Sequence, residues 1–174
     1  MYKLNGVMYS AEEIKSKVKE LAKQIEKDYA GEELLVVGIL KGASVFCADL
    51  IREIDLDVRM DFMVVSSYGS STESSGTVKI IKDLDVDIEN KNVLIVEDII
   101  DSGLTLSSLV AALKTRRPKS LKLCTLLDKP ERRTANIDVD YVGYVIEDKF
   151  IVGYGIDYDE KYRNLPYIGI VEDI

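Results

Sequence analysis

The chain has 174 residues, of which 47% are apolar and 31% are charged, with a formal net charge of −8. This length suits one domain with a full hydrophobic core, and the balance of residues excludes a disordered, fibrous or disulfide-stapled protein. The excess negative charge repels polyanions, so we expect no binding to nucleic acid or to an anionic membrane surface, although a local site can still hold a small anion.

Three features of the sequence narrow the location and the chemistry. No apolar run approaches the roughly 18 residues of a membrane span, and the first ten residues lack the pattern of a signal segment, so we expect a cytoplasmic protein. Cys47 and Cys124 lie in apolar stretches, which favours buried free thiols over a disulfide. Histidine is absent, so acid–base chemistry must come from carboxylates, lysine or tyrosine.

Helical and strand-like patterns alternate along the chain. Ser10 and Glu13 form a capping-box pattern that predicts a first helix over residues 11–29. The apolar run 34–40 predicts a strand that ends in a tight turn at residues 41–42, followed by a second helical pattern. Further strands are predicted over residues 58–65, 120–128 and 138–146, and from residue 92 a strand is predicted that passes into a helix ending near residue 113.

A very polar segment interrupts this alternation. Nine of the eleven residues 66–76 are Ser, Thr or Gly, and such a segment cannot pack in a core. The pattern is equally typical of a plain flexible loop and of a mobile lid, which would cover about residues 66–78.

The order of strands and helices predicts the fold class. Strands that alternate with helices favour an α/β fold with a mostly parallel sheet flanked by helices, and ligands bind at the carboxyl ends of such strands. The sequence has no internal repeat and no clear linker, so we expect residues 1–174 to form a single domain.

Three carboxylates lie beside a helix start near the middle of the chain. Glu97 and Asp98 end a strand, and Asp101 follows just before a Ser-Gly-Leu-Thr turn whose backbone N–H groups open the helix. A helix start of this kind binds phosphate, which the acids would repel unless a polyol or a divalent cation lay between them. The pattern therefore indicates a phosphorylated sugar with magnesium, and the alternative is a solvated acidic loop with Ser102 as a simple helix cap.

The stretch VLIVEDIIDSGLTL resembles the phosphoribosyl-pyrophosphate motif of the type I phosphoribosyltransferases, in which hydrophobic residues precede two acids. Four further segments, ILKGA, SSYG, LLDKP and EDKFIVGYGIDYDEKYRNL, resemble segments of the hypoxanthine-guanine phosphoribosyltransferases in order and spacing. This resemblance implies the type I fold with a small base-binding hood. It also implies a purine-salvage enzyme that moves the phosphoribosyl group of phosphoribosyl pyrophosphate onto hypoxanthine or guanine, with Mg²⁺ as cofactor and a homodimer or homotetramer as the assembly.

The same resemblance implies a role for each matching residue. Glu97 and Asp98 would hold the ribose hydroxyls and, through them, a magnesium ion, while Asp101 would act on the purine as a general base or a hydrogen-bonding group. The 5′-phosphate would be bound by Ser102, Gly103, Leu104 and Thr105. Pyrophosphate would be bound by the backbone N–H groups of Lys41 and Gly42, where the peptide bond before the lysine is often cis in this family, and by Ser67, Tyr68 and Arg163. The purine would be bound by Lys129, Phe150, Ile151 and Asp157, the last of which would also ligate a second magnesium ion.

Two alternatives to this function stay open. The ammonium group of Lys129 can only donate hydrogen bonds, which favours a 6-oxo group over the amino group of adenine, but xanthine shares the 6-oxo group. A xanthine-preferring enzyme is therefore one alternative. The other is a nucleotide-sensing regulator that binds nucleic acid on the same fold, and the net charge of −8 argues against the basic face that such a protein needs.

Overall fold

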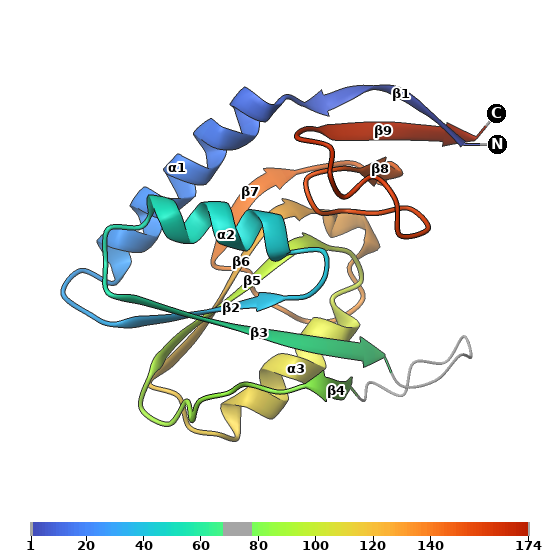
Figure 1. Cartoon of the computed structure of the whole chain (residues 1–174). Helices are drawn as coiled ribbons and strands as arrows, with labels where there is room; N and C mark the ends of the chain where they lie inside the picture. The colour runs from blue at the N-terminus through green and yellow to red at the C-terminus, as the bar shows by residue number, and fades with distance from the viewer. Residues whose placement is uncertain (1, 68–77, 174) are drawn as a thin grey trace.

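The computed structural model describes residues 2–67 and 78–173, which form a central sheet with helices on both faces and a small second sheet (Figure 1). In chain order its elements are β1 (Tyr2–Tyr9), α1 (Ala11–Asp28), β2 (Leu34–Ile39), α2 (Ser44–Glu53), β3 (Val58–Ser67), β4 (Val78–Lys82), β5 (Asn92–Ile100), α3 (Leu104–Lys114), β6 (Ser120–Asp128), a short 3-10 helix η1 (Pro130–Arg132), β7 (Tyr141–Val145), β8 (Ile151–Val152) and β9 (Ile168–Asp173).

The central sheet has the strand order β4-β3-β2-β5-β6-β7. Every neighbouring pair is parallel except β3 and β4, which are antiparallel. The prediction of a mostly parallel α/β sheet is therefore confirmed. Because the strands are parallel, their carboxyl ends lie along one edge, where the segments that follow β2, β5 and β6 can meet.

Helices cover the two faces of this sheet. Helices α1 and α2 lie on one face and α3 lies on the other (Figure 1). The strands are apolar on both faces, so that Val36 of β2 packs in the core under α1 and α2, whereas Val37 packs in the core under α3. Cys47 and Cys124 are both free and buried, as predicted.

Helix α1 begins where the sequence predicts. The Ser10 side chain accepts a hydrogen bond from the Glu13 N–H at 3.2 Å, and the Glu13 carboxylate accepts one from the Ser10 N–H at 2.7 Å, which completes the capping box. The stripe that α1 buries against the sheet consists of Ile14, Val18, Leu21, Ala22 and Ile25. In the part of the chain that the structure describes, no helix is both long and apolar enough to cross a membrane.

The second sheet has the order β1-β9-β8, and both pairings are antiparallel. Tyr2 is paired with Asp173, so this sheet joins the two ends of the described chain (Figure 1). The patterns used above did not predict these three strands, and the resemblance implied only a small hood. Strand β8 carries Ile151 from the segment that the resemblance assigns to the purine.

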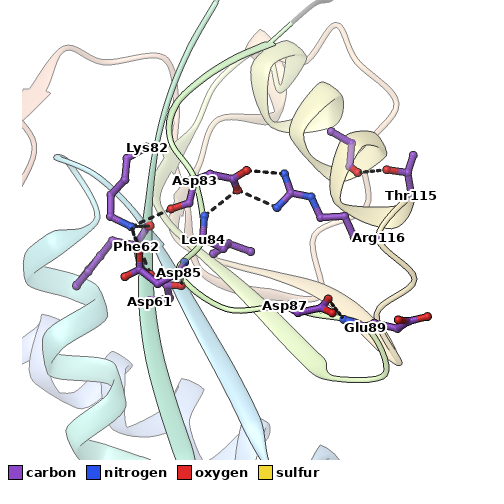
Figure 2. Close-up of polar contacts among 11 residues, drawn as sticks. Asp61, Phe62, Lys82, Asp83, Leu84, Asp85, Asp87, Glu89, Thr115 and Arg116 are labelled. Carbon is purple, nitrogen blue, oxygen red and sulfur yellow. Dashed lines mark hydrogen bonds and ion pairs between the residues drawn. The ribbon is translucent and has the colours of Figure 1, made fainter.

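Polar contacts hold β4 and the segment after it against β3 and α3 (Figure 2). The Lys82 ammonium donates to the carbonyl groups of Phe62 and Asp83, both at 2.9 Å, and lies 3.5 Å from the buried Asp61 carboxylate. Just after α3, Arg116 makes a bidentate pair with the Asp83 carboxylate at 2.8 and 2.9 Å. These contacts fix the chain on the far side of residues 68–77, which lie outside the described residues.

Candidate active site

The end of β5 carries two adjacent carboxylates. Glu97 and Asp98 are both partly buried. Burial raises the pKa of Glu97 well above its ordinary range, and the charge of Asp98 adds to the effect. Burial likewise raises the pKa of Asp98, to about 6. Two acids held in this way are stabilised in their charged form by a cation or by hydroxyl groups that donate to them.

The turn after β5 leads into α3. Gly103 has a φ of 76°, in the left-handed region, and a Cβ added to it would lie 3.0 Å from a methyl group of Ile137. Helix α3 begins at Leu104, so the N–H groups of its first turn have no carbonyl partner within the helix. The hydroxyls of Ser67 and Thr105 are 2.7 Å apart. Glu97 and residues 99–106 line a hollow of about 190 Å³ beside this turn.

The segment after η1 braces the same turn. Arg133 donates from Nε to the Asp101 carbonyl at 3.2 Å and pairs with the carboxylate of Asp128, while the N–H groups of Thr134 and Ala135 donate to the Ser102 carbonyl at 3.0 and 3.1 Å. The carbonyl groups of Asp101 and Ser102 are therefore both held by hydrogen bonds from residues 133–135. Sequence reasoning missed this role of Arg133, and the pair of adjacent arginines at 132 and 133 was the available signal.

Three backbone segments meet beside Asp98. The peptide bond between Leu40 and Lys41 is cis, as the resemblance implied. A Cβ added to Gly42 would lie 2.1 Å from Oδ2 of Asp98, and one added to Gly155 would lie 2.3 Å from the Gly42 carbonyl oxygen. Gly155, with a φ of 97°, therefore requires glycine, whereas a side chain at position 42 would push the Asp98 carboxylate or the segment at 41–43 out of place.

A cluster of opposite charges lies beside these glycines. The Lys41 ammonium is 2.7 Å from Glu160, and the Arg163 guanidinium is 3.1 Å from Glu160 and 3.2 Å from Asp157. Hydrogen bonds from Lys41 and Arg163 lower the pKa of the Glu160 carboxyl. Arg163 also donates to the Gly155 carbonyl at 2.8 Å, which joins the cluster to the glycine contact. Sequence reasoning did not single out Glu160.

Three of the residues that the resemblance assigns to the purine lie on the segment that runs from the end of β6 into β8, and Asp157 follows β8. Lys129 is 7% exposed, donates to the Lys149 carbonyl at 2.8 Å and lies 3.8 Å from the Asp101 carboxylate. The Phe150 ring is 43% exposed and meets Tyr158 edge to face, with centroids 5.2 Å apart. Ile151 is buried in β8. An ammonium donor, a carboxylate and an exposed aromatic face are thus available on adjoining segments.

The structure places most of the expected site residues along the carboxyl edge of the sheet. Ser67, which we expected at pyrophosphate, is hydrogen-bonded to Thr105 of the expected phosphate turn. Tyr68 and nearly all of the expected lid at 66–78 lie outside the described residues.

The carboxylates at the site could bind magnesium only together with a substrate that supplies further oxygen atoms. Across residues 2–67 and 78–173, no group of three or more acidic or thiol side chains could hold a metal ion by itself. Mg²⁺ usually takes one or two protein carboxylates and completes its shell with water and substrate phosphates. The pair at 97–98 and the separate carboxylate of Asp157 fit that mode of binding.

Comparison with known proteins places the chain among phosphoribosyltransferases. Residues 8–159 match the family model described as a phosphoribosyl transferase domain. The hypoxanthine-guanine phosphoribosyltransferase of Bacillus subtilis is 56% identical over 97% of this chain and 94% of that protein, and the one of Streptococcus thermophilus is 54% identical over 98% and 94%. A crystal structure of a hypoxanthine-guanine phosphoribosyltransferase from Bacillus anthracis superposes with a TM-score of 0.94, at 54% identity, and covers 99% of this chain and 100% of that one.

Proposed function

The chain belongs to the phosphoribosyl transferase family, and from this premise we propose how its site residues divide the work. It is a purine-salvage enzyme that transfers the phosphoribosyl group of phosphoribosyl pyrophosphate to hypoxanthine or guanine, giving IMP or GMP and releasing pyrophosphate. During the transfer the bond from C1′ to pyrophosphate loosens, positive charge builds on the ribose ring, and N9 of the purine attacks from the opposite side.

Glu97 and Asp98 bind the ribose hydroxyls in this proposal. Their partial burial and raised pKa values support the role, because hydroxyl donors and a nearby cation stabilise the charged form of such a pair. The N–H groups and hydroxyls of residues 102–105 bind the 5′-phosphate, and the left-handed Gly103 turns these N–H groups toward the hollow lined by residues 99–106.

Lys41, Gly42 and Arg163 bind the pyrophosphate that leaves. The two cations offset the charge that develops on it, and the absence of a side chain at Gly42 lets its backbone approach Asp98. Enzymes of this family generally depend on Mg²⁺. We propose that this chain does too: Glu97 and Asp98 hold one ion through the ribose hydroxyls, and Asp157 holds a second. When bound, magnesium supplies further positive charge at the phosphates.

Lys129 reads the base, and its buried ammonium beside Asp101 is the observation that carries the proposal. The ammonium donates to the 6-oxo group, and Asp101 accepts the proton that N7 or N9 loses, or holds that nitrogen by a hydrogen bond. The exposed Phe150 ring stacks on the purine, and the backbone of Ile151 meets its Watson-Crick edge. The ammonium cannot accept a hydrogen bond from the amino group of adenine, which is the physical reason for rejecting that base.

We also propose that residues 1–174 act as one domain and assemble as a homodimer or homotetramer. A hollow of about 500 Å³ between α1, α2 and residues 163–166 supports the assembly. It lies beside the pyrophosphate-binding segment, and apolar side chains of Ile14, Val18, Val45, Leu165 and Pro166 line part of it. Light scattering of the purified protein would measure the number of copies, and a monomer at micromolar concentration would contradict this part.

The test of the function is a turnover assay with phosphoribosyl pyrophosphate, Mg²⁺ and each of hypoxanthine, guanine, xanthine and adenine, followed by chromatography of the nucleotides. We expect IMP and GMP, no AMP, and loss of turnover with a chelator. Lys129→Met should lower kcat/KM for hypoxanthine about 100-fold or more, because a bound oxygen loses its charged donor. Preferred turnover of xanthine, or sugar-phosphate binding without turnover of any base, would overturn the assignment.

A further inference from the structure

One carboxylate already occupies both cations that we assign to pyrophosphate. Oε2 of Glu160 is 2.7 Å from the Lys41 ammonium, and Oε1 of the same carboxylate is 3.1 Å from the Arg163 guanidinium. Glu160 thus bridges two segments that are more than one hundred residues apart in the chain, as an anion between two donors.

The backbone around Glu160 holds the carboxylate in this place. Asp159, Glu160 and Tyr162 all have φ between 51° and 75°, the left-handed region that residues with a Cβ rarely adopt. The Glu160 N–H donates to Asp157 at 2.9 Å, and Tyr158 and Lys161 exchange two backbone hydrogen bonds, at 3.0 and 3.1 Å. A turn with three such residues persists only where its surroundings determine it, so the backbone of Glu160 has a fixed place from which its side chain reaches Lys41 and Arg163.

A carboxylate and a phosphate group accept hydrogen bonds from the same kinds of donor. Each presents a pair of negatively charged oxygens, and ammonium and guanidinium groups can only donate. The Lys41 and Glu160 side chains are 66% and 64% exposed, so their ion pair is weak and readily exchanged. Pyrophosphate bound at Lys41 and Arg163 therefore competes with Glu160 for these donors, and Glu160 can reclaim them when pyrophosphate leaves.

We propose that Glu160 is an internal competitor for pyrophosphate that limits the affinity of the enzyme for this product. The inference rests on the proposed assignment of Lys41 and Arg163 to pyrophosphate. It adds a residue that acts on product release and leaves recognition of the base unchanged.

The experiment compares Glu160→Gln with Asp159→Asn by calorimetric titration with pyrophosphate at saturating Mg²⁺. Both changes remove one negative charge from adjacent exposed positions. Among the described residues, the ion pair of Asp159 is with Lys161 at 3.8 Å and does not involve Lys41 or Arg163, which makes Asp159 a matched control. We expect Glu160→Gln to tighten pyrophosphate binding about threefold to tenfold, in keeping with the loss of ion pairs to the exposed Lys41 and the partly buried Arg163, and Asp159→Asn to change it less than about twofold. The KM for hypoxanthine should stay at the wild-type value in both.

Variants of the two cations separate the role of Glu160 from the assignment of Lys41 and Arg163 to pyrophosphate. In a Lys41→Met protein, Glu160→Gln should tighten binding much less, because one of the two contested donors is gone. Equal tightening by Glu160→Gln and Asp159→Asn, or unchanged or weaker binding in Glu160→Gln, would overturn the role of Glu160. If Lys41→Met and Arg163→Met bind pyrophosphate as tightly as the wild type, the assignment of the two cations fails instead. Thermal unfolding of each variant checks that it is folded.

Discussion

Replacing Gly42 with alanine tests whether the close approach of three segments serves catalysis. The new Cβ would lie 2.1 Å from Oδ2 of Asp98, whereas ordinary contact begins at 3.4 Å. Asp98 or the segment at 41–43 must therefore move by about 1 Å, and a misplacement of that size costs on the order of 100-fold in rate. Because Asp98 is assigned to the ribose, we expect kcat/KM for phosphoribosyl pyrophosphate to fall about 100-fold while the KM for hypoxanthine changes little.

The assay is initial rates with either substrate varied, together with thermal unfolding. Gly31→Ala is the control for adding a methyl group, because a Cβ there meets nothing within 4 Å, although its left-handed φ of 77° adds a backbone strain that Gly42 lacks. That variant should lose about 1 kcal/mol of stability and keep its kinetic constants. The reasoning is refuted if Gly42→Ala retains kcat/KM within about threefold of wild type, or if Gly31→Ala loses as much activity.

Two further changes test contacts that lie outside the reacting groups. Arg133→Met breaks a pair whose side chains are only 19% and 13% exposed, so we expect a loss of about 2 kcal/mol, or roughly 6 °C in the unfolding midpoint, and a higher KM for phosphoribosyl pyrophosphate. Arg132→Met breaks an exposed ion pair and should lower the unfolding midpoint by less than about 2 °C, as measured by calorimetry of both variants. Equal losses in the two variants would contradict the bracing role of Arg133. The hydrogen bonds from Arg116 lower the pKa of Asp83 in the folded protein. The stability that this pair contributes is therefore fully present above the ordinary aspartate pKa of about 4, and it is lost as the pH falls through the lowered pKa of the folded state. In urea unfolding, wild type should exceed Asp83→Asn in stability at pH 6 and converge with it at acid pH, and a constant difference at all pH values would count against the pair (Figure 2).

Local patterns were enough to predict the elements around the site. The capping box at Ser10 and Glu13 predicted the start of α1 because both partners lie within one turn. The apolar run before Glu97 and the glycine at 103 predicted a strand that passes into a helix, which β5 and α3 confirm. The resemblance implied the cis bond before Lys41, which periodicity cannot indicate.

Features that depend on distant partners could not be predicted in this way. Residues 2–9 form a strand only because β9 pairs with them, and the two residues of β8 are too few to show a period. The contacts of Arg133 and Glu160 likewise join segments that only the folded chain brings together. The sequence and its resemblance therefore predicted the residues that we assign to the substrates, whereas the residues that contact them across the fold needed the structure.

The pairing of β1 with β9 also sets an order on folding. The partners Tyr2 and Asp173 lie at opposite ends of the described chain, so the small sheet can close only after the last strand has been synthesised. Strands β2, β3 and β5 pair within the first hundred residues and can form while the chain is still on the ribosome. The strand that carries Glu97 and Asp98 can therefore pair with β2 before the small sheet that carries Ile151 closes.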